Sequence, residues 1–285
     1  MSAELAYVMT VLAGGALAGG STGLLGQYIV GMRIPLLGVC VSHAALAGAV
    51  FGSLAGLTGP ALLAPALGGA AAAALLLGLL DPRRIRADTN VVMGILFSLT
   101  MGLAFLGLGL FEQFGRNKNE ALSLLWGSLS FCGPRDVQLI ALTAAAEVLF
   151  VALFYKELRA ILFSREHAAA AGVHVTAVWT GFLVLTSVVL TVNFKVVGGL
   201  MIYSLMVNPA AAAFQLVRGY GRALVLSVVL GAASGVGGFL IALQWHLPTG
   251  ATIVILSSGL VLAAGVAAAL RRRLRAERAG GNSAA

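Results

Sequence analysis

The chain has 285 residues, of which 60% are hydrophobic and only 10% are charged, and its mean hydropathy is +0.99. Soluble domains carry about 25% charged residues, so this composition excludes a soluble enzyme, a disordered protein and a secreted disulfide scaffold. The two cysteines, Cys40 and Cys132, form neither a CxxC metal motif nor a framework of bridges. The net charge of +8 would suit a nucleic-acid partner, but its distribution along the chain has to be considered first.

Apolar segments long enough to cross a membrane, about 20 residues each, follow one another along the whole chain. They are Leu5–Val30, Ile34–Leu57, Pro60–Leu80, Asn90–Leu110, Val137–Phe154, Val175–Val192, Val196–Val217, Ala223–Leu243 and Ala251–Leu270. No stretch between them is long enough for a soluble domain. We therefore expect an all-α fold, a polytopic transmembrane helical bundle of about eight or nine spans. Residues 1–270 would form one transmembrane domain and residues 271–285 a basic tail.

Two apolar segments need a separate interpretation, one because it is short and the other because it could be mistaken for a signal peptide. Ala121–Phe131 is too short to cross a membrane alone, and we interpret it as a re-entrant or interfacial segment. At the N-terminus, Glu4 precedes the apolar run and no Lys or Arg does. Because the positive region of a signal peptide is missing, we expect the first span to be retained.

The positive charges alternate between the two sides of the predicted bundle. Fourteen of the 18 Lys and Arg lie on one side, at Arg33, Arg83, Arg84, Arg86, Lys156, Arg159, Arg165, Arg218, Arg222, Arg271, Arg272, Arg273, Arg275 and Arg278. Four lie on the other, at Arg116, Lys118, Arg135 and Lys195. The positive-inside rule places the larger set and the C-terminal tail in the cytoplasm, and with nine spans the N-terminus outside. The charge therefore indicates orientation and predicts no nucleic-acid partner. The tail is interpreted as a stop-transfer anchor that could also contact anionic membrane lipid.

Polar groups inside the spans are costly, so they are the candidates for function. His43 lies in the middle of Ile34–Leu57, and Cys40, three residues earlier, shares its helix face. Imidazole and thiolate both suit Zn²⁺, although further ligands would have to come from other helices or from water. The alternative is a histidine bonded to a backbone carbonyl with Cys40 as a small core residue. Glu147 could belong to a cation path or be a protonated acid packed between helices.

Three amides inside the last spans, Asn193, Asn208 and Gln215, are expected to hydrogen-bond across helices. Asn208 also precedes Pro209, which lacks an N–H, and this pair predicts a helix break near a pathway.

The cytoplasmic loop Lys156–Val173 contains a short helical pattern, in which Ser164-Arg165-Glu166-His167 is followed by four alanines and Gly172. A short helix of this kind has the right shape to dock into a groove on a partner protein. The chain has no GxGxxG, GxxxxGK[ST] or HExxH motif. We therefore expect no enzymatic activity, and an ATP-driven pump would need an ATPase on another chain.

Five segments match one known pattern in order along nearly the whole chain. They are Gly38–Gly48 (GVCVSHAALAG, against G-D-x-x-[SA]-H-x-x-L-x-G), Leu124–Leu129 (LLWGSL, against LLFGSLL), Glu166–Gly172 (against E-x-A-x-x-x-G), Val197–Ala211 (against VGxLL…LLxxPAA) and Leu247–Ala251 (LPTGA, against LPSGA). This set resembles the integral-membrane permease subunit of bacterial ABC transporters that take up zinc, manganese or iron. The resemblance implies a homodimer in the bacterial inner membrane. It also implies two cytoplasmic ATPase subunits and a periplasmic or lipid-anchored metal-binding protein.

The resemblance also assigns roles to residues of this chain. His43 would contact the ion in the pore, and the segment with Ser164, Arg165, Glu166, His167 and Gly172 would receive the ATPase stroke. The family has an Asp four residues before the histidine, where this chain has Val39, and often an Asp-Pro pair before the coupling glutamate, where this chain has Ser164-Arg165. If Cys40 replaces the missing Asp, the softer ligand shifts the preference from Mn²⁺ towards Zn²⁺.

The predicted function is therefore that of a permease that translocates a divalent metal ion and binds no cofactor of its own. Zinc is the favoured ion, and manganese and iron are the alternatives. The alternative function is a stand-alone ion channel or ion-coupled secondary carrier, for which Glu147 is the available acid.

Overall fold

The computed structural model describes residues 3–79, 88–114, 129, 132–198 and 202–281, and the regular structure of these residues is helical throughout. The helices are α1 (Ala3–Gly31), α2 (Leu36–Leu54), η1 (Gly59–Leu62), α3 (Leu63–Leu79), α5 (Thr89–Gln113), α7 (Pro134–Leu153), α8 (Tyr155–Phe163), α9 (Arg165–Ala170), α10 (Val175–Val197), α11 (Ile202–Leu216), α12 (Tyr220–Trp245) and α13 (Thr249–Gly281). Among the described residues, eight helices are long and apolar enough to cross a membrane. The predicted all-α bundle of about eight or nine spans is confirmed.

Helix ends follow local signals in the sequence. The first two spans are joined by a tight turn in which Arg33 adopts a left-handed conformation with φ 60°. The N–H of Ile34 donates to the Ile29 carbonyl at 3.0 Å and that of Arg33 to the Val30 carbonyl at 3.1 Å, which is the Schellman pattern of a helix C-terminus. Pro35 then precedes α2, where its missing N–H costs nothing. The turn lies where the predicted spans Leu5–Val30 and Ile34–Leu57 meet, so their separation is confirmed.

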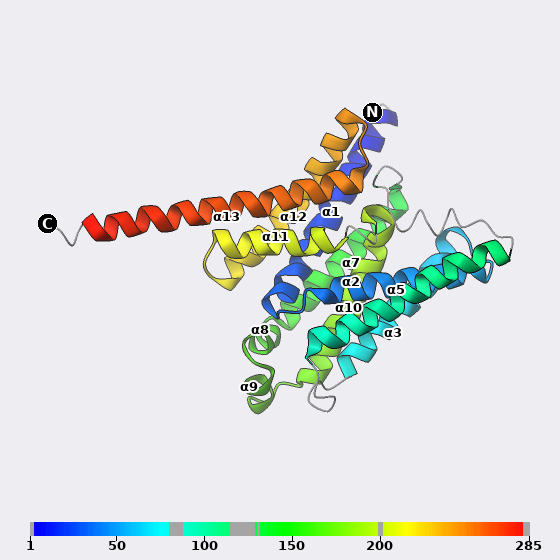
Figure 1. The fold of residues 1–285 in the computed structure, drawn as a ribbon, viewed down its shortest axis with the longest axis horizontal. Coiled ribbons are helices and arrows are strands. Elements are labelled where there is room, and N and C mark those ends of the chain that lie inside the picture. The colour runs from blue at the N-terminus through cyan, green and yellow to red at the C-terminus, as the bar shows by residue number, and fades with distance from the viewer. Residues whose placement is uncertain (1–2, 80–87, 115–128, 130–131, 199–201, 282–285) are drawn as a thin grey trace.

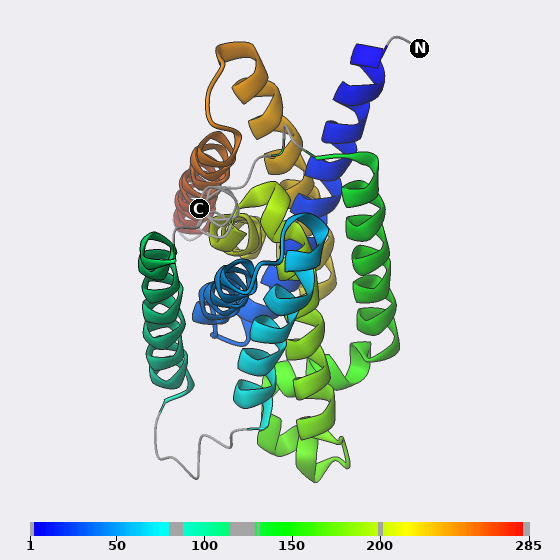
Figure 2. The same ribbon diagram turned by 90° about the vertical axis from the view of Figure 1, so that its right-hand side faces the viewer.

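Two groups of helices pack side by side (Figure 1). In one group α1 packs along α12 and α11, and α13 lies across α11 and α12. In the other, α2 packs against α3 and α5, and α10 packs on α3. In Figure 2, α5 and α7 run along opposite flanks with α2, α3 and α10 between them. The far end of α13 extends well beyond the other helices (Figure 1).

Small residues bring α1 and α12 into backbone contact. A methyl group added at Gly19 would overlap the carbonyl oxygen of Gly231, and one added at Gly231 would overlap that of Gly19. Gly15 and Gly235 form a second close pair one turn away. Such spacing of small residues is typical of transmembrane helices, because lipid offers no hydrophobic drive and packing must supply the attraction.

The segment Val196–Val217, which we predicted to be one span, is divided in the structure. Helix α10 ends at Val197, Gly198 follows with φ 90°, and α11 begins at Ile202. Helix α11 has 15 residues, which at 1.5 Å per residue cover about 22 Å, less than the hydrocarbon thickness of about 30 Å. The positive φ of Gly198 ends the helix, and the hydropathy of the segment does not reveal this.

The helix break predicted at Asn208 and Pro209 is wrong, because α11 runs through Pro209 without interruption. A proline removes one backbone hydrogen bond, and surrounding packing can hold the helix together in spite of that loss. Ala121–Phe131 lies outside the described residues except for Leu129, which is buried.

The side-chain amides of Asn193, Asn208 and Gln215 differ in whether they bond to another helix or to their own. Asn193 donates to the Ser21 hydroxyl of α1 at 3.1 Å, and Asn208 donates to the Ser257 hydroxyl of α13 at 3.0 Å, so both cross-helix predictions are confirmed. Gln215 instead donates to the Ala211 carbonyl of its own helix at 3.1 Å, and that prediction is wrong.

Candidate functional site

Helix α2 holds the first candidate metal ligands in its buried middle. His43 is 5% exposed and Cys40 is fully buried, whereas Val39, at the position of the family's Asp, is partly exposed. The His43 ring lies edge-on to Phe97 of α5, with ring centroids 4.9 Å apart. The i, i+3 spacing therefore places imidazole and thiol on one side of α2, within the protein.

The hydrogen bond of His43 leaves one ring nitrogen for a ligand. Its Nδ1 lies 2.9 Å from the Val39 carbonyl, one turn earlier in the same helix. A carbonyl can only accept, so we assign the proton to Nδ1, and Nε2 then carries the free lone pair. Histidines that bind metals commonly hold their second nitrogen in this way, because the bond orients the ring. A neutral core histidine makes the same bond, so it is compatible with both interpretations given above.

The remaining candidate, Glu147, lies away from α2. It belongs to α7, which packs against α1 and α10, and its side chain is 1% exposed. Neither carboxyl oxygen has a hydrogen-bond partner among the described residues. Across the same residues, no group of three or more His, Cys, Asp or Glu side chains is placed to hold a metal ion. Further ligands for His43 would therefore have to come from outside this set, from water or from another chain.

The predicted coupling segment forms the short helix that its sequence indicates. Helix α9 begins after Ser164, whose hydroxyl accepts from the His167 N–H at 3.3 Å. It ends in a Schellman motif, in which the Val173 N–H donates to the Ala168 carbonyl at 3.0 Å and Gly172 has φ 85°. Glycine suits that position because it reaches positive φ without strain. This predicted helix with its glycine stop is confirmed.

Helices α8 and α9 lie together at one end of the molecule, at the lower left of Figure 1. Glu166 and His167 are exposed, while Ala168 is buried beneath the helix. The exposed side of α9 therefore presents charged and polar groups beyond the ends of the long helices. This placement is compatible with docking of a partner protein.

Trp179 is a residue of this region that the sequence analysis did not single out. The carbon at the centre of the Arg165 guanidinium lies 3.7 Å from the centroid of the Trp179 ring of α10. Burial beside this ring lowers the pKa of the Arg165 guanidinium below its usual value. A tryptophan near the end of a predicted span is an interfacial signal, but nothing in the sequence pairs it with Arg165.

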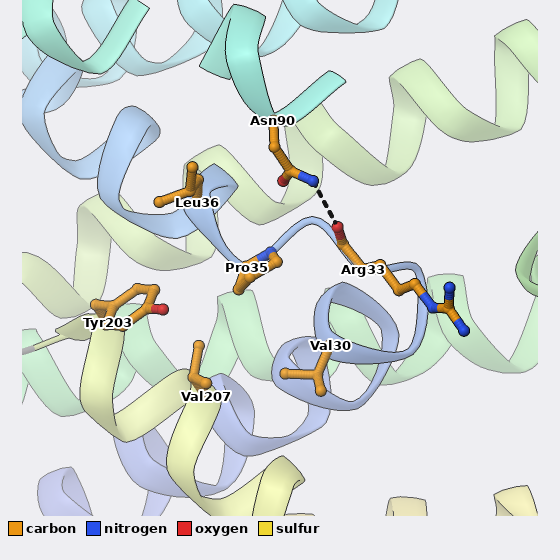
Figure 3. Close-up of a pocket in the computed structure, with 7 residues that line it drawn as sticks. All are labelled: Val30, Arg33, Pro35, Leu36, Asn90, Tyr203 and Val207. Carbon is orange, nitrogen blue, oxygen red and sulfur yellow. Dashed lines mark hydrogen bonds between the residues drawn. The ribbon is translucent and has the colours of Figure 1, made fainter. Parts of the chain in front are cut away.

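A hollow at the turn between α1 and α2 was also missed, and it has a volume of about 440 Å³. Its lining residues are Val30, Arg33, Pro35, Leu36, Asn90, Tyr203 and Val207 (Figure 3). The Asn90 amide donates to the Arg33 carbonyl at 3.2 Å and joins α5 to the turn. The lining includes no His, Cys, Asp or Glu, and the Arg33 guanidinium points away from the other lining residues (Figure 3), so the hollow offers no typical metal ligand.

Comparison with known proteins gives one consistent result. The ABC 3 transport family matches residues 4–268. The chain is 30% identical over 262 residues to the zinc transport system membrane protein TroC of Treponema pallidum, covering 90% of this chain and 87% of the relative. It is 27% identical over 239 residues to the manganese transport system membrane protein MntC of Listeria monocytogenes, covering 83% and 82%. Among solved structures, PsaBC from Streptococcus pneumoniae in complex with Fab has a similar fold, with a TM-score of 0.77, 22% identity and 90% of each chain covered.

Proposed function

The chain belongs to the ABC 3 transport family, and on this premise we propose that it carries zinc through the bacterial inner membrane into the cell. Membership bears out the resemblance found in the five sequence segments. It makes the chain a multi-pass membrane permease of the ABC metal importers. The metal, the assembly and the orientation form our proposal.

The ligand types on α2 favour zinc. Relatives are named for zinc and for manganese, so the ion has to be inferred from this chain's own residues. The contact of His43 Nδ1 with the Val39 carbonyl supports a metal contact, because a proton assigned to Nδ1 leaves the Nε2 lone pair for a ligand, and the Cys40 thiol lies on the same helix face. Nitrogen and sulfur ligands suit Zn²⁺ better than Mn²⁺, which prefers oxygen. Manganese and iron are the alternatives.

Transport requires Cys40 and His43, which are buried on α2, to become accessible first from one side of the membrane and then from the other. We propose that two permease copies enclose the path and that two ATPase subunits dock at α9. A periplasmic or lipid-anchored protein would deliver the ion. ATP binding would then shift the population between outward-open and inward-open states. The proposed docking segment comprises Ser164, Arg165, Glu166, His167 and Gly172, and the positive-inside rule favours the cytoplasmic side for it.

The proposal is tested by zinc uptake into vesicles that hold the permease with its ATPase. His43→Ala should lower the uptake rate by roughly tenfold or more, because one metal contact is lost in the pore. Ser42→Ala is the matched control, since Ser42 is the adjacent buried polar residue and its hydroxyl donates to the Gly38 carbonyl of its own helix at 2.7 Å. Unimpaired uptake in His43→Ala would refute the pore assignment. Uptake by the permease without any ATPase would refute the ABC mechanism and favour the stand-alone carrier.

A further inference from the structure

One charged side chain of α9, that of Arg165, contacts helix α10 of the membrane bundle directly. Arg165 is the first residue of α9, and its guanidinium carbon lies 3.7 Å from the centroid of the Trp179 ring. Trp179 is 3% exposed and belongs to the first turns of α10. Among the described residues, no carboxylate pairs with Arg165, so the aromatic face is its charge-complementary neighbour.

Helix α9 also packs against α8, where the ring centroids of Phe163 and His167 lie 6.0 Å apart. The helix has six residues, too few to be stable without tertiary contacts. Ala168 is its one fully buried side chain, and Glu166, His167, Ala169 and Ala170 are exposed. The Ser164 cap and the turn at Gly172 shape the helix but do not attach it to the bundle. The stack between Arg165 and Trp179, with Ala168 buried beneath the helix, is therefore the contact that attaches the start of α9 directly to α10.

Trp179 is the first of four aromatic rings that contact one another in series. Trp179 is followed on α10 by Phe182, with centroids 6.5 Å apart. The Phe182 ring packs against the Tyr28 ring of α1, with centroids 5.5 Å apart. The Tyr28 ring packs in turn against the Tyr220 ring of α12, also with centroids 5.5 Å apart. Large rigid rings in contact pass a displacement on, because a packed interior has no free space to absorb it. Trp179 is thus joined through buried rings to the helices α1 and α12.

We propose that Arg165, stacked on Trp179, is a positioning residue that fixes the coupling helix α9 to α10, so that a movement imposed on α9 by the ATPase reaches the transmembrane bundle. The proposal rests on the proposed function, since it takes an ATPase to be the partner of α9. Arg165 stands in this chain where the family pattern given above often has the proline of an Asp-Pro pair.

The first test measures the position of α9 in the full permease without any ATPase. Hydrogen exchange of the backbone amides of residues 166–171 should be roughly fivefold to tenfold faster in Arg165→Gln than in wild type, since loss of the stack frees the helix. Arg159→Gln is the matched control. It removes the same charge from neighbouring α8, where the guanidinium carbon lies 5.6 Å from the centroid of the Tyr155 ring. Equal exchange in Arg165→Gln and wild type would overturn the proposal, and so would equal acceleration by Arg159→Gln.

The second test measures coupling in the complex with the ATPase, reconstituted in vesicles. Compared at an ATPase concentration that saturates each variant, Arg165→Gln should move roughly threefold fewer zinc ions per ATP hydrolysed than wild type. Trp179→Tyr keeps an aromatic face and should restore most of the ratio relative to Trp179→Leu. An unchanged ratio in Arg165→Gln would overturn the positioning role. If wild type neither binds an ATPase nor transports metal, the proposed function fails, whereas the exchange experiment still decides whether the stack holds α9.

Discussion

The close contact between α1 and α12 makes Gly19→Ala a strong test of the packing. A methyl group at Gly19 would meet the carbonyl oxygen of Gly231 well inside van der Waals contact. The obstructing atom belongs to the backbone of a helix, so it cannot rotate away as a flexible side chain could. The two helices must therefore move apart, and the neighbouring contacts along the pair move with them.

The loss of stability in Gly19→Ala follows from the overlap of the new methyl group with the Gly231 carbonyl and from the length of a neighbouring hydrogen bond. Carbon and carbonyl oxygen rest roughly 3.3–3.6 Å apart, so the helices would separate by more than about 1 Å. One turn along, the Ser227 hydroxyl of α12 donates to the Gly23 carbonyl of α1 at 2.6 Å, and this separation would break that bond. Overpacking costs about 1–3 kcal/mol and the lost hydrogen bond about 0.5–1.5 kcal/mol. We expect Gly19→Ala to lower the free energy of unfolding by about 2–4 kcal/mol.

The assay is thermal unfolding of the purified permease in detergent, followed by the loss of the monodisperse peak in size-exclusion chromatography. At about 2–4 °C per kcal/mol, the midpoint should fall by roughly 5–15 °C. Gly102→Ala is the matched control, because a methyl group there, on the exposed side of α5, meets no atom within 4 Å. The reasoning is refuted if both variants unfold at the wild-type temperature, or if Gly102→Ala is destabilised as much as Gly19→Ala.

Three further predictions concern α11, α9 and α2. Asn208→Leu removes the hydrogen bonds to Ser257 and Ser258. It should lower the free energy of unfolding by about 1–2 kcal/mol, and an unchanged midpoint in the same thermal assay would contradict this role. Gly172→Ala forces a side chain into φ 85° and should destabilise the end of α9 by about 1 kcal/mol, read as faster amide exchange confined to that segment. Cys40→Ser replaces sulfur with oxygen and should lower the ratio of zinc to manganese uptake by roughly threefold or more; an unchanged ratio would leave Cys40 as plain packing.

Hydropathy and local signals were enough to predict most of the fold. Apolar runs of about 20 residues identify spans without knowledge of their neighbours, because the thickness of the bilayer sets their length. The gap between the first two spans and the short helix that stops before Gly172 were likewise predicted, since helix stop signals act over about one helical turn. Sequence alone failed between residues 196 and 217. There a glycine with positive φ divides an apolar run, and Pro209, the residue that usually breaks a helix, is accommodated.

The sequence by itself determined the class of protein, the family pattern and the short list of polar groups inside the spans. It also placed Cys40 and His43 on one helix face, because helical periodicity is a local property. Only the tertiary structure decided which groups meet across helices. It separated Glu147 on α7 from the pair on α2, and it seated Arg165 on Trp179. These contacts join residues that are far apart in the chain or lie on different helices, so they depend on how the helices pack, which no local pattern specifies.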